Sequence, residues 1–309
     1  MLSNKTEKNM VVNYSKKPKN KKKNKLLNMS PYFFIAPYFL LFAVFMLYPL
    51  IYSFVLSFSE WRAGVMTFVG LENYKMLLTD PLFWKSLSTT VLILIIQVPL
   101  MLILATFIAT VINSELLRFK GIIRLAFFLP ALIDLVTYSL VFSLMFNESY
   151  GMVNQALNAL GLDSIKWFSD GTWAKILIII ALTWRWTGYN AIIILSGLQS
   201  ISKDLYESAS IDGASRITCF FRITIPMLKP VILFCAILST IGTLQLFAEP
   251  FVLTGGGPRN ETNTVILYLY DKAFGSFDFG LASAGAYVIT TIIAVLSFFQ
   301  IKLSKGGEI

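Results

Sequence analysis

Long apolar stretches separated by short polar segments make up most of this chain of 309 residues. A helix needs roughly 20 mostly apolar residues to cross the hydrocarbon core of a membrane. Internal prolines and glycines, such as Pro99 and Gly242, do not exclude a span, because neighbouring helices satisfy the freed backbone groups. The pattern predicts an all-α membrane protein with six transmembrane helices. These helices are expected at about 32–58, 87–113, 122–146, 173–197, 229–250 and 281–301.

Composition supports the same class. Hydrophobic residues form 56% of the chain and charged residues 14%, whereas a soluble domain carries about a quarter charged residues. The chain contains no histidine, which excludes a His-ligated metal and a His-based catalytic site. Its two cysteines, Cys219 and Cys235, show no CxxC spacing. We therefore expect an integral membrane protein with no metal site, and an enzyme is disfavoured.

Lysine and arginine are distributed unevenly between the predicted loops. With both termini in the cytoplasm, the inner segments carry 18 of these residues and the outer loops carry seven, as the positive-inside rule favours. We expect a basic, disordered tail at 1–30 held near anionic lipid of the bilayer, a six-helix membrane domain at 31–302 and a short cytoplasmic tail at 303–309. The basic tail lacks interleaved aromatic residues, so no nucleic-acid partner is expected.

The cytoplasmic segment 199–230 begins with the pattern of a short surface helix. Ser202 suits the N-cap position, and Leu205, Ala209 and Ile211 give the helix a narrow apolar side. Gly213 predicts its end, since glycine readily adopts the left-handed conformation that commonly follows a helix.

A second short helix is expected from Ala214 to about Arg222. Pro226 and Pro230 then re-direct the chain toward the fifth span. Together the two pieces predict a helix, a bend and a helix at the membrane surface.

The spacing in this segment resembles a signature of the permease subunits of binding-protein-dependent carbohydrate ABC importers. That signature reads Glu-Ala-Ala, three residues, Gly, nine residues and Ile-x-Leu-Pro. Here it stands as Glu207-Ser208-Ala209, Gly213 and Ile223-Thr224-Ile225-Pro226, with Ser208 and Ile225 as the departures. Further matches occur in the expected order, at 48–53, 70–74, 127–130, 197–199 and 253–258.

The resemblance implies the fold of a type I importer permease, with a coupling-helix loop at 199–230 and no ATPase site of its own. This loop would insert into an ABC ATPase dimer that uses ATP and magnesium, while the chain itself binds no cofactor. A second homologous permease and an extracytoplasmic sugar-binding protein are the other expected partners, in the cytoplasmic membrane of a bacterium. The coupling residues that the resemblance implies are Glu207, Ala209, Asp212, Gly213 and Pro226.

Polar and aromatic side chains within the predicted spans are the candidates for a substrate pathway. Ionisable groups inside a membrane are costly and tend to face a cavity or a partner. Sugars pack their CH faces on aromatic rings, while their hydroxyls need donors and acceptors. The same residues, and Arg185 among them, are also explained as interfacial anchors, packing residues or contacts with a partner subunit. The candidates are Asp134, Tyr138, Trp184, Trp186, Tyr189, Asn190, Gln245 and Glu249.

The glycine-rich turn before the last span does not have the sequence of a phosphate-binding loop. No Lys-Ser or Lys-Thr pair follows Gly256, Gly257 and Pro258 at the required place. We expect a flexible outer loop, and the resemblance implies that it faces the binding protein.

Other functions stay open at this point. An ion-coupled secondary transporter would usually show internal repeats, and none is evident between residues 30–165 and 166–301. A membrane-embedded enzyme is disfavoured because paired catalytic motifs are absent. An ABC permease for a solute other than a sugar is also compatible with the residues.

Overall fold

The computed structural model of the chain describes residues 25–62, 65–114 and 117–305. Two compact units are present, Met1–Tyr52 and Ser53–Ile309. The first contains α1 (Lys25–Phe42), the π-helical turn η1 (Ala43–Leu47) and the start of α2 (Tyr48–Ser57). Helix α1 thus begins before the predicted boundary at residue 30. The rest of the expected basic tail, 1–24, and the last four residues, 306–309, lie outside the described residues.

The helical run Tyr32–Ser57 is long and apolar enough to cross a membrane, and four more helices of the described chain are so as well. They are α4 (Pro81–Asn113), α8 (Gly171–Gln199), the continuous run Arg216–Leu244, and α13 (Phe279–Lys305). Asp80 caps the start of α4 by accepting a hydrogen bond from the Leu82 amide at 2.8 Å. Asp170 caps the start of α8 by accepting one from the Thr172 amide at 2.9 Å. Such caps satisfy amides that the first turn of a helix leaves free.

The third predicted span is broken. In place of one helix over 122–146, the structure has α5 (Lys120–Leu132) and α6 (Leu135–Met145), bent by 96°. Ile133 and Asp134 are extended, and the Asp134 carboxylate accepts hydrogen bonds from the amides of Val136 and Thr137 at 3.0 and 3.2 Å. Within the described residues, the predicted number of six spans is reached when this bent pair counts as one span.

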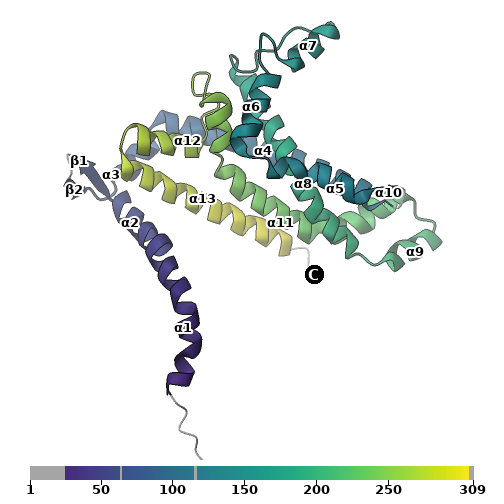
Figure 1. The fold of residues 1–309 in the computed structure, drawn as a ribbon, viewed down its shortest axis with the longest axis horizontal. Coiled ribbons are helices and arrows are strands. Elements are labelled where there is room, and N and C mark those ends of the chain that lie inside the picture. Colours follow the sequence, from purple (N-terminus) through teal and green to yellow (C-terminus); the bar gives the residue numbers. More distant parts are fainter. Residues whose placement is uncertain (1–24, 63–64, 115–116, 306–309) are drawn as a thin grey trace, which may run out of the picture. The chain divides into compact units, whose positions relative to one another are not determined.

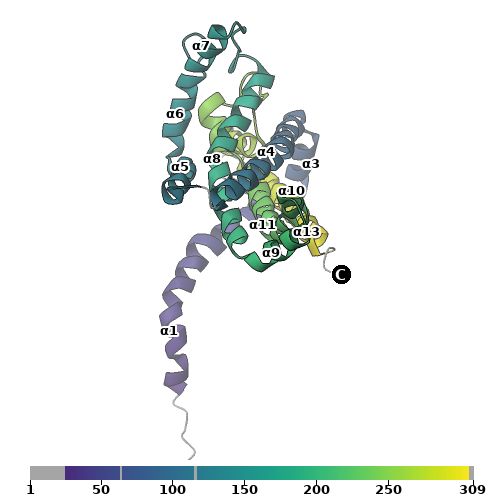
Figure 2. The same cartoon turned by 90° about the vertical axis from the view of Figure 1, so that its right-hand side faces the viewer.

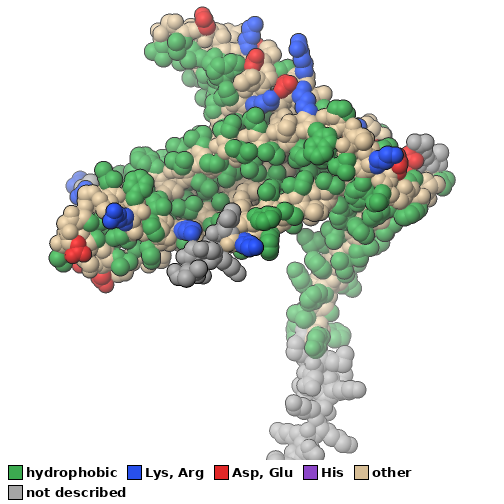
Figure 3. All heavy atoms as spheres, turned by 180° about the vertical axis from the view of Figure 1, so that it is seen from behind, with side chains coloured by type: hydrophobic (Ala, Val, Ile, Leu, Met, Phe, Trp, Pro, Cys, Tyr) green, Lys and Arg blue, Asp and Glu red, His purple; other side chains and the backbone are tan. Residues whose placement is uncertain are grey.

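The core of the second unit lies where α4, α8 and α11 (Ile225–Leu244) meet (Figures 1 and 2). Ala105 and Ala109 of α4 pack there with Ala191 of α8 and Leu228 of α11. Small residues allow membrane helices to approach closely. Figure 3 shows hydrophobic side chains covering most of the visible face of the long helices, as a lipid-facing bundle requires.

Gly188 allows a close approach between α8 and α5. A Cβ atom at this position would overlap the backbone carbonyl of Phe127, so α8 and α5 touch main chain to main chain. No residue with a side chain fits at Gly188 unless α5 moves away.

Short elements connect the long helices. An antiparallel hairpin, β1 (Ser59–Arg62) and β2 (Val65–Phe68), is a small exception to the all-α prediction and pairs Ser59 with Phe68. The buried Asn73 amide donates to the carbonyls of Ser57 and Ser59 and fixes this hairpin to the next helix. The remaining elements are α3 (Glu72–Thr79), α7 (Met152–Ala159), α9 (Lys203–Ile211), α10 (Arg216–Cys219), η2 (Phe220–Thr224), η3 (Pro250–Thr254), α12 (Val265–Tyr270) and η4 (Asp271–Gly275).

Candidate functional site

The segment 199–230 contains the predicted surface helix with its predicted boundaries. The Ser202 hydroxyl caps α9 by accepting from the Asp204 amide at 3.3 Å. Helix α9 ends at Asp212 and Gly213, where Gly213 has φ +79° and the Ala214 amide donates to the Ala209 carbonyl at 2.9 Å. This geometry requires the left-handed backbone that glycine adopts most easily.

Tyr206 is the residue through which α9 attaches to the membrane bundle, and the sequence pattern missed it. Its ring packs against the core formed by α4, α8 and α11, and its hydroxyl lies 2.9 Å from Thr224 Oγ1. The three residues of the predicted apolar side do not pack on the bundle in the same way: Leu205 and Ile211 are exposed, and Ala209 is half-buried. The exposed side of α9 therefore carries apolar groups together with Glu207.

The second half of the segment also differs from the prediction. The helix that starts at Arg216 does not end near Arg222 but continues through η2 and α11 to Leu244. Pro226 and Pro230 lie in it without re-directing the chain. Pro226 follows a π-helical turn, and a local change of hydrogen-bond register is one way in which membrane helices tolerate proline.

A cavity of about 360 Å³ lies between α4, α8 and the end of α11. Trp186, Tyr189 and Asn190 line it from α8. The chain leaves helical conformation after Leu244, before the predicted end of the span at 250, and the residues that follow also line the cavity. Non-helical backbone at membrane depth is tolerated only where it is buried in protein or lines a cavity. The break therefore marks this cavity as a functional feature.

Arg185 and Glu249 form an ion pair beside the cavity. Arg185 Nη1 lies 3.5 Å from Glu249 Oε1, and both side chains are largely buried. The guanidinium also lies 4.7 Å from the centre of the Tyr138 ring and donates to the Ile133 carbonyl at 3.5 Å. Arg185 thus connects the break after Leu132 with Glu249, which follows the break after Leu244.

The structure brings together five of the eight candidate pathway residues in the wall of the cavity. They are Trp186, Tyr189, Asn190, Gln245 and Glu249. Tyr138 is buried behind them against Arg185, and Trp184 packs on the rings of Tyr138 and Phe142.

Asp134 is not in the cavity wall but caps α6. Its charge in an apolar sequence has a structural explanation, since the carboxylate satisfies the amides that the 96° bend leaves free.

Sequence reasoning missed the other residues of the wall, among them Gln97, Met101 and Thr243. Gln97 and Asn190 each direct an amide group at the Met101 sulfur, at 3.5 and 3.4 Å, and Thr243 donates to Gln97 Oε1 at 3.4 Å. The signal for Gln97 was present, because it is a single amide in the apolar run Ile95-Ile96-Gln97-Val98.

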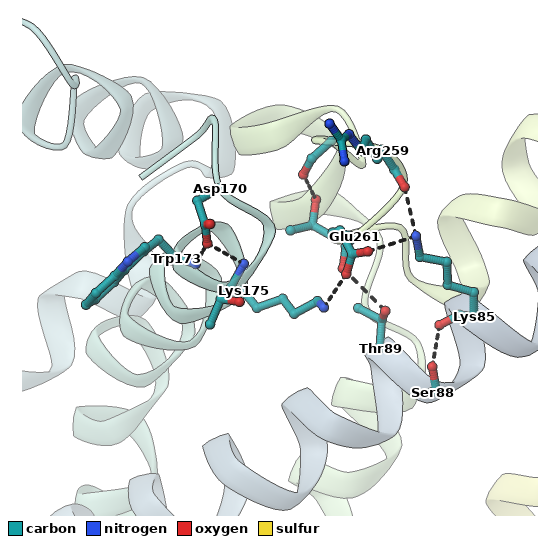
Figure 4. A network of polar contacts seen from close by, with 11 residues as sticks. Lys85, Ser88, Thr89, Asp170, Trp173, Lys175, Arg259 and Glu261 are labelled. Carbon is teal, nitrogen blue, oxygen red and sulfur yellow. Dashed lines mark hydrogen bonds and ion pairs between the residues drawn. The ribbon is translucent and has the colours of Figure 1, made fainter. Parts of the chain in front are cut away.

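Glu261, just after the glycine-rich turn, pairs with two lysines. The Glu261 carboxylate forms ion pairs with Lys85, near the start of α4, at 2.9 Å and with Lys175, near the start of α8, at 2.6 Å (Figure 4). Lys85 also donates to the Arg259 carbonyl at 2.9 Å. Hydrogen bonds from Lys175 and Lys85 lower the pKa of Glu261 to about 2.

This anchoring fixes the neighbouring turn, where Thr262 Oγ1 donates to the Gly257 carbonyl at 2.6 Å. The predicted turn is therefore present, and the contacts beside it come from residues far away in the chain.

Fold and cavity define a multi-pass membrane transport protein. A family model described as binding-protein-dependent transport system inner membrane component matches residues 84–305. The chain belongs to this family of membrane permeases.

Related proteins and structures agree. The chain is 46% identical over 262 residues to the lactose transport system permease protein LacF of Rhizobium radiobacter, covering 83% of this chain and 88% of that protein. It is 37% identical over 283 residues to the arabinooligosaccharides transport system permease protein AraP of Halalkalibacterium halodurans, covering 90% and 89%. A crystal structure of a bacterial ABC transporter that imports the acidic polysaccharide alginate contains a chain with a TM-score of 0.81 at 21% identity, covering 91% of this chain and 97% of that chain. The last comparison supports the fold alone.

Proposed function

We propose that the chain is the permease subunit of an ATP-driven carbohydrate importer and forms half of its translocation pathway. The observation that carries this proposal is the cavity, whose wall combines three aromatic side chains with amide and hydroxyl groups. Aromatic faces suit the CH groups of a sugar, and the polar groups suit its hydroxyls. The names of the relatives, which include lactose and arabinooligosaccharide permeases, support the same substrate class.

Energy comes from a separate ABC ATPase dimer that binds ATP and magnesium, and α9 is the part of this chain that docks on it. Glu207 is exposed on this helix, as a residue in contact with a partner must be in an isolated chain. The Tyr206–Thr224 hydrogen bond then carries movement of α9 into the fifth span. A second, homologous permease supplies the other half of the pathway.

On the outer side, the turn at Gly256, Gly257 and Pro258 faces an extracytoplasmic binding protein. Glu261 and its two lysines hold this turn at the ends of α4 and α8. Binding of the partner at this turn would therefore act on α4 and α8, two helices that line the cavity. Both termini lie in the cytoplasm of a bacterium in this arrangement.

The test is purification of the complex from cells that produce either the wild-type chain or the Glu207→Ala, Gly213→Pro double variant. An ATPase and a second permease should co-purify with the wild type, together with ATP-dependent uptake of labelled sugar. The folded double variant should lose both the ATPase and uptake. Gly121→Ala serves as a control for folding and insertion, because Gly121 is outside the cavity wall and an added Cβ atom there meets no atom within 4 Å. Uptake by the wild type that survives ATP depletion, with no ATPase co-purified, would favour an ion-coupled carrier instead.

A further inference from the structure

The cavity wall carries charge of one sign, which is negative. Among the fifteen described residues that line the cavity, Glu249 alone is charged. Arg185, which neutralises Glu249, is not part of the wall. Its guanidinium contacts the Tyr138 ring and the Ile133 carbonyl, and it lies behind the wall residue Trp186, 5.4 Å from the centre of that ring. A ligand in the cavity therefore meets the carboxylate before it meets the guanidinium.

One acceptor for the amide groups of the wall is weak. Gln97 and Asn190 are buried; the NH₂ group of Gln97 contacts the thioether of Met101, and that of Asn190 contacts the same sulfur while also donating to the Trp186 carbonyl at 3.0 Å. A thioether sulfur is a weak acceptor. The oxygen of a ligand hydroxyl is a stronger one, so a polyhydroxylated ligand would gain hydrogen bonds from donors that the protein leaves underused.

From these two observations we propose that the cavity binds an uncharged saccharide unit and disfavours anionic sugars. Glu249 accepts hydrogen bonds from the sugar hydroxyls, and Arg185 positions Glu249 from behind. This inference rests on the proposed carbohydrate transport and adds to it a rule for the charge of the substrate.

Electrostatics decide against an acidic ligand. A sugar carboxylate in the cavity would lie beside Glu249 in surroundings of low dielectric constant, where repulsion between like charges is strong. The wall offers no second cation to compensate it. A neutral sugar meets no such repulsion, and its hydroxyls donate to the carboxylate in charge-assisted hydrogen bonds.

Size limits the ligand as well. Small-molecule sites typically measure about 300–1,000 Å³, and this cavity of about 360 Å³ is at the small end. It suits a monosaccharide or one terminal unit of an oligosaccharide, packed on Trp186 and Tyr189.

The test uses the purified complex of the chain with its co-expressed partner subunits, so that the selectivity of the external binding protein does not contribute. Lactose, maltose and arabinobiose are compared with their aldonic acids, which carry one carboxylate each. Binding is measured by equilibrium dialysis and by the change in tryptophan fluorescence, since Trp186 lies in the wall. The wild type should bind the best neutral sugar at least tenfold more tightly than its aldonate.

Glu249→Gln should remove this preference or reverse it, because the Arg185 charge then lacks its partner. Should this variant fold poorly, Arg185→Gln combined with Glu249→Gln removes both charges at once, and the preference should fall to within about twofold. Glu72→Gln is the matched control. Its side chain is exposed and pairs weakly with Lys75 at 3.9 Å on α3, so the preference should not change.

The outcomes separate the two proposals. If the wild type binds a neutral sugar and its aldonate within twofold, or if a folded Glu249→Gln variant keeps the wild-type preference, the charge rule is wrong while carbohydrate transport stands. If none of the six saccharides binds and the complete system takes up no labelled sugar, the proposed function itself is wrong and the charge rule falls with it.

Discussion

The hydroxyl of Tyr206 lies 2.9 Å from Thr224 Oγ1 and links α9 to the helix that continues as the fifth span. The two residues are 18 positions apart, on either side of the bend at Gly213. This hydrogen bond, with the packing of the Tyr206 ring, fixes the surface helix to the bundle.

Tyr206→Phe removes the hydrogen bond and keeps the ring. A hydrogen bond of this kind contributes about 0.5–1.5 kcal/mol, so amide hydrogen exchange in α9 should become about two- to tenfold faster in the variant. Mass spectrometry of exchange in detergent measures this. Thr224→Val should have the same effect, and the double variant should add little to either. Tyr150→Phe, at an exposed position, is the control; equal exchange in Tyr206→Phe and wild type would contradict the proposed link.

Gly188→Ala should destabilise the protein strongly, because its Cβ would overlap the Phe127 carbonyl. Overpacking of this kind typically costs about 1–3 kcal/mol, and a lower Tm in detergent would show it. Gly242→Ala is the matched control. Its Cβ meets no atom within 4 Å and it lies within α11, where alanine is favoured over glycine by about 1 kcal/mol. Equal Tm values for the two variants would argue against the close contact.

Asp134 allows a capping role to be distinguished from contact with substrate. Asp134→Ser keeps an oxygen that can accept from the amides of α6, so Tm and sugar uptake should stay close to wild type. Asp134→Ala removes the cap and should lower stability by about 1 kcal/mol. Loss of uptake in Asp134→Ser without loss of stability would return Asp134 to the list of pathway residues.

Hydropathy located the long helices because burial in lipid requires uninterrupted apolar sequence, and this requirement is local. The end of α9 was equally predictable, since the left-handed backbone conformation at Gly213 is a requirement of that single position. The pair Arg185 and Glu249 was not, because the two residues are far apart in the chain and only packing brings them together. Tyr206 was missed because its ring packs on other helices, while the local pattern emphasised Leu205 and Ile211.

The outer turn should be sensitive to acid. The pKa of Glu261 is about 2, below its ordinary value of 4.5. Its pairs with Lys85 and Lys175 therefore contribute stability above pH 4.5, which is lost as the pH falls from 4.5 toward 2. These partly exposed pairs contribute no more than about 1 kcal/mol each. The Tm of the wild type should exceed that of Glu261→Gln at pH 7, and the difference should shrink below pH 4.5.

Glu72→Gln, which disrupts a longer and more exposed pair, should show no such pH-dependent difference from wild type. A difference between wild type and Glu261→Gln that stays constant from pH 7 to pH 3 would mean that the ionisation of Glu261 does not hold the turn.

The contact between Gly188 and the Phe127 carbonyl also determines which parts of the bundle can move independently. Rotation of α8 about its own axis would bring Thr187 or Tyr189, both larger than glycine, against the main chain of α5. We therefore expect helices α5 and α8 to move together. A change in the shape of the cavity during a transport cycle would then come from the rest of its wall, which is formed by α4, α11 and the residues after Leu244.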